Sequence, residues 1–177
     1  MPRSRYHIFS PDAPYFMTST VNNWLPVFTR PETVHIVLDG WRYLQKNHDF
    51  ILYGYVILEN HIHLIAQSPQ LTKDMQRFKS YTARKIIDYL HEVKAERLLH
   101  LFALFKRRHK QESKYQVWEE GYHPQCIENE DVMRQKLEYM HQNPVKRGYV
   151  ETAEQWRYSS AGNYAGHPGL IEVVCQW

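Results

Sequence analysis

The residues of this chain best suited to chemistry are two histidines spaced two apart, His61 and His63, within the largely apolar run 53–66. An extended strand points alternate side chains to the same face, so we expect both imidazoles to lie side by side. Two neutral imidazoles held in this way supply half of a metal site. Histidines that only pack on a strand have the same spacing, so the rest of a site must come from elsewhere in the chain.

A tyrosine and an asparagine in a later helical stretch are the best candidates for that other half. Tyr139 and Asn143 are four residues apart, which places them on one helix face about one turn apart. Asn143 precedes Pro144, and a residue before proline is disfavoured in helical geometry, so we expect the helix to end there with the amide free to bind a metal. A packed helix tyrosine and a helix-end asparagine are the simpler interpretation of the same two residues.

The chemistry that would use this set is attack on a phosphodiester by a tyrosine hydroxyl. A divalent cation would polarise the phosphate, which compensates for the modest reactivity of a phenol. The product would be a covalent phosphotyrosine, and a second hydroxyl could reverse the reaction and join different DNA ends. Single-stranded or hairpin-flanked DNA would suit such a site. Tyr81 is a second candidate nucleophile beside basic residues, but no ligand-type residue follows it by one turn.

Two other functions remain open. A metal-dependent hydrolase or phosphodiesterase also uses His-x-His, usually with a third histidine or a carboxylate, and would not need Tyr139. A hairpin-DNA-binding protein that no longer mobilises DNA would keep affinity without chemistry.

The charge distribution indicates a polyanionic partner. The net charge is only +3, yet residues 73–110 carry eleven Lys and Arg against four Asp and Glu. An ordinary solvated helix face would show a similar excess. Trp118 and Tyr122 are candidates for stacking on extruded bases, although core packing is expected for Trp118. The candidate DNA contacts, each also compatible with a plain surface charge, are Lys79, Arg84, Lys85, the cluster 106–110, Lys146 and Arg147.

Length and composition favour one domain. With 177 residues and 43% hydrophobic content we expect a single catalytic domain over residues 1–160 and a tail over 161–177. No run has transmembrane length and the N-terminus lacks a secretory signal pattern. Cys126 and Cys175 have no metal-type spacing, which fits a reducing cytoplasm. A bacterial cytoplasmic protein, monomeric or homodimeric and without a membrane partner, is the expectation.

The expected elements alternate as strand, helix, two strands, helix, strand and helix. A helical stretch opens at Pro31, and a second one from Thr72 either continues or breaks and restarts through residues 97–105. Asn129 is the expected N-cap of the last helix. This order predicts an α+β fold with the His-x-His strand at its centre. The expected strands are residues 15–21, 50–58 and 61–67, with short pieces at 115–118 and 124–127, and the last helix spans 130–142.

An ordered set of segments resembles the HUH-type single-strand transposases with one catalytic tyrosine, and among them the REP-associated tyrosine transposases. The set runs from about residue 14 to 160 in the order of that family. It comprises residues 15–28, Gly54-Tyr-Val-Ile-Leu-Glu-Asn-His-Ile-His-Leu-Ile65, Phe78-Lys-Ser-Tyr81, Val117-Trp-Glu-Glu-Gly-Tyr122, Tyr139-Met-His-Gln-Asn-Pro-Val-Lys-Arg-Gly-Tyr-Val150 and Trp156-Arg-Tyr-Ser-Ser160.

The resemblance implies a ferredoxin-like (RRM-like) antiparallel sheet with helices packed on one face. It also implies His61 and His63 as the histidines of the HUH motif, Tyr139 as nucleophile and Asn143 as third metal ligand. The implied cofactor is Mg or Mn, and the implied reaction passes through a 5′-phosphotyrosine beside a palindromic hairpin. Two departures are Glu59, where relatives often have proline, and a longer stretch from about 91 to 111.

Overall fold

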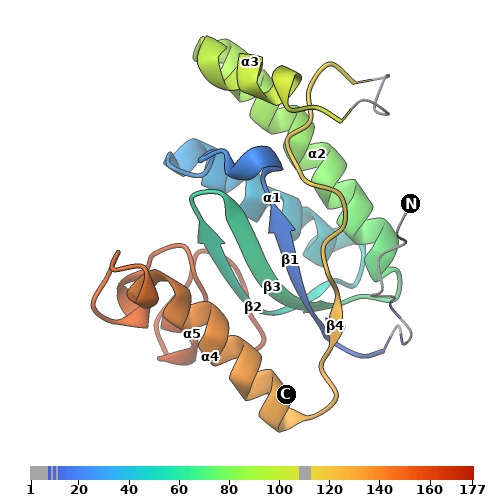
Figure 1. Ribbon diagram of the computed structural model, residues 1–177. Coiled ribbons are helices and arrows are strands. Elements are labelled where there is room, and N and C mark those ends of the chain that lie inside the picture. The colour runs from blue at the N-terminus through green and yellow to red at the C-terminus, as the bar shows by residue number, and fades with distance from the viewer. Residues whose placement is uncertain (1–7, 9, 11, 108–112) are drawn as a thin grey trace.

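The computed structural model describes residues 8, 10, 12–107 and 113–177 of the chain (Figure 1). Of the predicted basic cluster 106–110, residues 108–110 therefore lie outside the described part. The elements, in chain order, are β1 (Tyr15–Thr20), η1 (Asn22–Trp24), α1 (Pro31–Asn47), β2 (Ile51–Leu58), β3 (His61–Gln67), α2 (Leu71–Glu92), α3 (Glu96–Leu104), β4 (Gln125–Cys126), α4 (Glu130–Lys146), η2 (Ala153–Gln155) and α5 (Ala161–Tyr164).

The strands form one antiparallel sheet in the order β2-β3-β1-β4. The β-α-β-β-α-β succession with this order is the ferredoxin-like arrangement, so the predicted α+β class is confirmed. The predicted central position of the His-x-His strand is confirmed as well, because β3 lies between β2 and β1. Residues 115–118 contribute only one isolated bridge, between Trp118 and Val21, and no strand of their own.

Both faces of the sheet are covered, because β2 carries buried apolar residues on both sides. One face packs against α1 and α2, where the Trp41 and Phe78 rings stack with centroids 5.6 Å apart. The opposite face packs against α4 through Val56, Leu58 and Ile65. The expectation of helices on one face thus holds for α1 and α2, whereas α4 lies on the other face (Figure 1).

The long helical stretch breaks and restarts. Helix α2 ends at Glu92, and Lys94 takes the left-handed region with φ of 53° before α3 begins at Glu96. Figure 1 shows α3 at the end of α2 that lies away from β4. Within the described residues, no helix combines the length and the apolar content needed to cross a membrane.

Helix α4 begins as predicted and ends later than predicted. The Asn129 side chain accepts a hydrogen bond from the Val132 amide at 3.0 Å, which confirms the N-cap. The predicted end at Asn143-Pro144 is wrong, because the helix continues through Pro144 to Lys146. Proline in the last turn removes only one intrahelical hydrogen bond.

The helix ends instead at a glycine in the left-handed region. Gly148, with φ of 72°, donates to the Val145 carbonyl at 2.9 Å, and Tyr149 donates to the Pro144 carbonyl at 2.9 Å. These two bonds are the Schellman pattern that satisfies the last carbonyls of a helix. Gly148, four residues after Pro144, therefore marks the end of the helix better than the proline does.

A glycine in β2 allows α4 to lie close to the sheet. A Cβ placed on Gly54 would lie 2.5 Å from Leu137 Cδ2 and 3.0 Å from Met140 Cε, both on α4. Any larger residue would push the helix outward or displace these side chains. The distance between α4 and the histidine strand is therefore set in part by Gly54.

Candidate functional site

The site is built on the α4 side of the sheet, where β3 presents both histidines. His61 and His63 are 4% and 5% exposed, and their ring centroids lie 4.9 Å apart. The strand alternation places them on the same face as Val56 and Ile65, beneath α4. The structure therefore confirms the predicted side-by-side arrangement of the two imidazoles.

One nitrogen of each ring is already held by a neighbouring side chain. His61 Nδ1 lies 2.7 Å from Asn60 Oδ1, and His63 Nδ1 lies 2.7 Å from Thr18 Oγ1. The Asn60 amide is oriented because its Nδ2 donates to the Trp24 carbonyl at 3.4 Å. Such contacts at one ring nitrogen fix the orientation of the ring and direct the other nitrogen, Nε2, towards a ligand.

Both histidines are held in the neutral form. Burial, together with the positive charge of Arg147, lowers the pKa of His61 to about 4. Burial also lowers the pKa of His63 to about 3, with additional effects from His61, Arg147 and Lys136. Neutral imidazole is the form that binds a metal, so both rings are suited to that role at neutral pH.

Tyr139 lies over this pair at the surface of α4. Its ring centroid is 5.5 Å from that of His63 and 6.0 Å from that of Phe16, both in edge-on geometry. The side chain is 45% exposed, so DNA in solution could reach the phenol. The packed-tyrosine interpretation of the sequence does not describe a residue this open. Tyr81 is similarly exposed, at 42%, but lies on α2, which packs against the other face of the sheet.

The C-terminal half of α4 runs towards the His61 end of β3. Tyr139 contacts His63, and two turns later Arg147 Nη1 pairs with Glu59 Oε1 at 2.8 Å, in the turn just before His61. Asn143 lies midway between these two contacts on the same helical stripe. Its Nδ2 donates to the Tyr139 carbonyl at 2.9 Å, which leaves the amide oxygen as the group available to a ligand.

The donor set fits a divalent cation. Two neutral imidazoles with oriented rings and one amide oxygen are offered by His61, His63 and Asn143. In the part of the chain that the structure describes, no group of three or more His, Cys, Asp and Glu side chains could hold a metal. The candidate for a third ligand is the amide oxygen of Asn143, which lies one turn beyond Tyr139 on α4.

Sequence reasoning missed a cation beside the site. Lys136, one turn before Tyr139 on α4, places its Nζ 4.9 Å from the centroid of the Phe16 ring and lowers the pKa of His63 through its charge. A lysine three residues before a candidate nucleophile shares its helix face, so the signal was present in the spacing. The role of Thr18 required the pairing of β1 with β3, in which Thr18 lies opposite His63.

The predicted DNA contacts divide between two locations. Lys146 and Arg147 lie at the end of α4, near the histidines. Arg84 and Lys85 are exposed on α2, on the other side of the sheet. Lys79 donates to the backbone carbonyls of residues 119 and 121 at 2.6 Å each, so its ammonium holds the segment that runs beside β1.

Two further side chains have structural partners. His141 is held at 2.8 Å from Ser160 Oγ, and burial lowers its pKa to about 4. Trp118 is 4% exposed and donates from Nε1 to Thr82 Oγ1 at 3.0 Å. The core position expected for Trp118 is thus confirmed.

Comparison with known proteins gives one curated relative and structural neighbours. No family model matches the chain. A Haemophilus influenzae protein named "Putative REP-associated tyrosine transposase" is 28% identical over 115 residues, which are 65% of this chain and 61% of that protein. The match thus spans less than two thirds of the relative.

The structural comparison covers the whole chain. The structure of a REP-associated tyrosine transposase bound to a REP hairpin aligns with a TM-score of 0.67, at 15% identity, over 100% of this chain and 94% of the other. At this identity the alignment establishes a shared fold. A crystal structure titled as a putative transposase from Deinococcus radiodurans aligns over 80% of this chain and 97% of its own, at 15% identity, with a TM-score of 0.47. In sequence and in fold, this chain is similar to the REP-associated tyrosine transposases, as its motifs indicated.

Proposed function

We propose that this protein cuts and rejoins single-stranded DNA next to palindromic hairpins, with Tyr139 as the nucleophile and a 5′-phosphotyrosine as the intermediate. The observation that carries the proposal is the position of Tyr139, an exposed phenol whose ring centroid lies 5.5 Å from that of the buried, neutral His63. A reactive hydroxyl beside an oriented pair of metal-ligating side chains is what phosphoryl transfer needs.

In the proposed reaction, each bond that forms at phosphorus is matched by one that breaks. Tyr139 Oη attacks the phosphorus, and its proton passes to solvent, which the exposed phenol contacts. The bond from phosphorus to the 3′ oxygen breaks, and that oxygen leaves as a free 3′-hydroxyl after taking up a proton. The 5′ end stays attached to the tyrosine. Attack by another 3′-hydroxyl on this phosphotyrosine restores a phosphodiester and releases Tyr139.

His61, His63 and Asn143 would hold the divalent cation, Mg or Mn. The cation, when bound, neutralises charge on the scissile phosphate and polarises it. Thr18 and Asn60 keep the two imidazoles oriented, and burial keeps them unprotonated. Lys136 adds positive charge where the phosphate would lie.

Hairpin DNA is the proposed partner because the structural neighbour is a REP-associated tyrosine transposase bound to a REP hairpin. Lys146 and Arg147 extend the positive charge of the site along α4 and would contact the backbone. Arg84 and Lys85, on the other side of the sheet, would serve only a DNA that wraps around the molecule. We place the protein in the bacterial cytoplasm, where such DNA is found.

The test is formation of a covalent adduct. The protein is incubated with labelled single-stranded DNA that carries a hairpin drawn from repeated palindromes of the host, in the presence of Mg²⁺ or Mn²⁺, and is then denatured. We expect a labelled band in wild type and in Tyr81→Phe, a matched control of similar exposure, and none in Tyr139→Phe. An adduct that persists in Tyr139→Phe, or none on any hairpin, would overturn the proposal.

The same experiment separates the alternatives. A metal-dependent phosphodiesterase would cut the DNA without an adduct and would survive Tyr139→Phe. A hairpin-binding protein without chemistry would shift the DNA in a native gel and cut nothing.

A further inference from the structure

Trp24 stands out because its backbone is strained and its ring is open to solvent. The residue has φ of 54°, a left-handed conformation that bulky side chains rarely adopt, and Asn23 before it has the same φ. The ring is 56% exposed, so burial does not offset this cost. Local strain without a packing gain is expected where function fixes a side chain.

The ring of Trp24 continues the row of rings at the candidate site. Its centroid lies 5.5 Å from that of His61, which lies 4.9 Å from His63, which in turn lies 5.5 Å from Tyr139. Trp24 therefore forms the exposed end of a path that leads to the proposed nucleophile. A DNA strand whose phosphate lies at Tyr139 would bring a neighbouring base within reach of Trp24.

Hydrogen bonds hold the backbone of Trp24 in place. The Trp24 amide donates to the Val21 carbonyl at 2.9 Å, and its carbonyl accepts from Asn60 Nδ2, the amide that also contacts His61. Asn22 Nδ2 donates to the Phe105 carbonyl at 3.0 Å. A ring carried on a fixed backbone loses less conformational freedom when a ligand stacks on it than a ring on a mobile loop.

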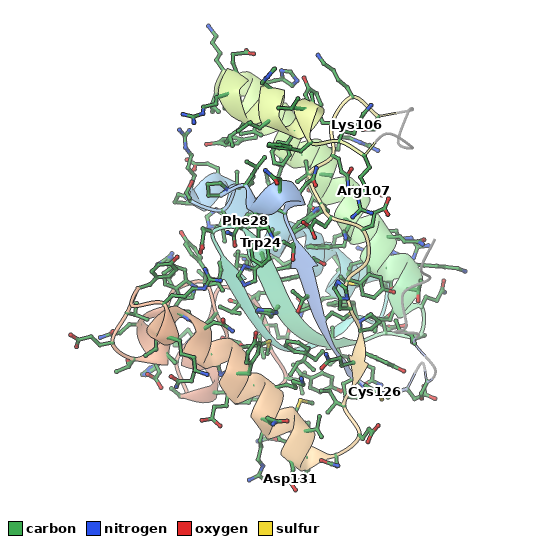
Figure 2. The ribbon with its side chains drawn as sticks, in the orientation of Figure 1. Trp24, Phe28, Lys106, Arg107, Cys126 and Asp131 are labelled. Carbon is green, nitrogen blue, oxygen red and sulfur yellow. The ribbon has the colours of Figure 1, made fainter. Side chains whose placement is uncertain are left out.

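Positive charge lies on the same side of the molecule. The contact between Asn22 and Phe105 places η1 beside Lys106, whose ammonium donates to the Ser113 carbonyl at 2.7 Å, and Arg107, which pairs with Glu120 at 2.9 Å. Figure 2 shows Trp24 at the end of β1 and the two basic residues beyond it. An aromatic platform next to basic side chains is the usual arrangement for binding single-stranded nucleic acid.

From this geometry we propose that Trp24 is a stacking platform for an unpaired nucleobase of the DNA strand that enters the site. The proposal rests on the proposed function for the identity of the strand, and it adds a contact that reads the base and not the backbone. In this role Trp24 takes the place of Trp118, because Trp118 is buried in the core and is not available to an extruded base.

The test measures binding without metal, so that no cutting occurs. Two probes are used in EDTA: a short oligothymidylate and an abasic oligomer of the same length and backbone charge. We expect wild type to prefer the oligothymidylate, and Trp24→Ala to lose about tenfold in affinity for it while binding the abasic oligomer unchanged. Trp24→Phe should keep most of the affinity. Tyr43→Ala, which removes a ring of 58% exposure from α1, is the matched control and should bind both probes as wild type does.

Trp24→Gly separates stacking from folding. Glycine adopts a φ of 54° without penalty, so this variant should unfold at a temperature no lower than Trp24→Ala while losing the same affinity. The proposal is overturned if wild type does not distinguish the two probes, if Trp24→Ala loses nothing, or if it loses equally on both. If no adduct forms in wild type or in any variant, the proposed cutting is wrong, whereas the result on base stacking still holds.

Discussion

At the residue scale, the atoms that decide the behaviour of the site are the Nδ1 nitrogens of His61 and His63. Each is held by a neighbouring side chain, Asn60 in one case and Thr18 in the other. A ring held in this way presents Nε2 in a fixed direction, and its orientation is settled before a cation arrives. The two supporting residues are therefore positioning residues for the proposed metal site.

Replacement of Thr18 by valine tests this support, because the shape is kept and the hydroxyl is lost. We expect Mn²⁺ affinity, measured by titration calorimetry, to fall by about 10- to 100-fold. Thr20→Val is the matched control, since Thr20 lies opposite His61 on β1 but His61 is held by Asn60. Equal losses in both variants would show that the hydroxyl of Thr18 has no special role.

A second prediction at this scale concerns pH and His141. Burial lowers its pKa from the ordinary 6.5 to about 4, so the unfolded chain binds the proton more readily than the folded one. The contribution of neutral His141 to the free energy of unfolding should therefore be fully present above pH 6.5 and should be lost as the pH drops towards 4. For His141 this loss is on the order of 1–3 kcal/mol.

The measurement is urea unfolding at pH 7.5 and pH 5. His141→Gln removes the titrating group and retains a polar side chain near Ser160, so stability should change less between the two pH values than in wild type. An unchanged difference would mean that other groups account for the pH dependence.

At the element scale, the position of α4 determines whether Tyr139 meets the histidines. The helix carries Tyr139, Asn143 and Arg147, and it rests on β2 at Gly54. Its far end is tied to the turn between β2 and β3 by the ion pair of Arg147 with Glu59. This pair gives Glu59 a charged partner within the turn.

Gly54→Ala should displace α4. The added Cβ would lie 2.5 Å from Leu137 Cδ2, so we expect a loss of about 1–3 kcal/mol in urea unfolding and slower adduct formation. Leu137→Ala in the same chain makes room and should restore part of the adduct rate. Gly162→Ala, whose Cβ would meet nothing closer than 3.9 Å, should behave as wild type.

At the scale of the whole molecule, one chain supplies every group of the candidate site. The histidines come from β3 and the tyrosine from α4, and the rings of His63 and Tyr139 contact each other within one chain. Mixing His63→Ala with Tyr139→Phe protein should therefore give no adduct, because neither chain holds a complete set. Recovery of adduct in the mixture, measured against each variant alone, would show that two chains exchange α4.

The sequence predicted the elements that have strong local signals. The alternation around His61 and His63, the N-cap at Asn129 and the apolar stripe of α2 depend on near neighbours in the chain. The late end of α4 does not follow from the proline, because Pro144 fits into the last turn and the helix ends only at Gly148. The support by Thr18, the carbonyl contacts of Lys79 and the exposure of Trp24 depend on strand register and distant packing, which local patterns do not contain.

The side chain of Asn60 touches both halves of the binding surface. Its oxygen contacts His61, and its nitrogen contacts the carbonyl of Trp24. The same side chain thus supports the imidazole of His61 and the backbone that carries the proposed platform. Under the two proposals, loss of the Asn60 side chain would remove one support of the cation site and one support of the base platform at the same time.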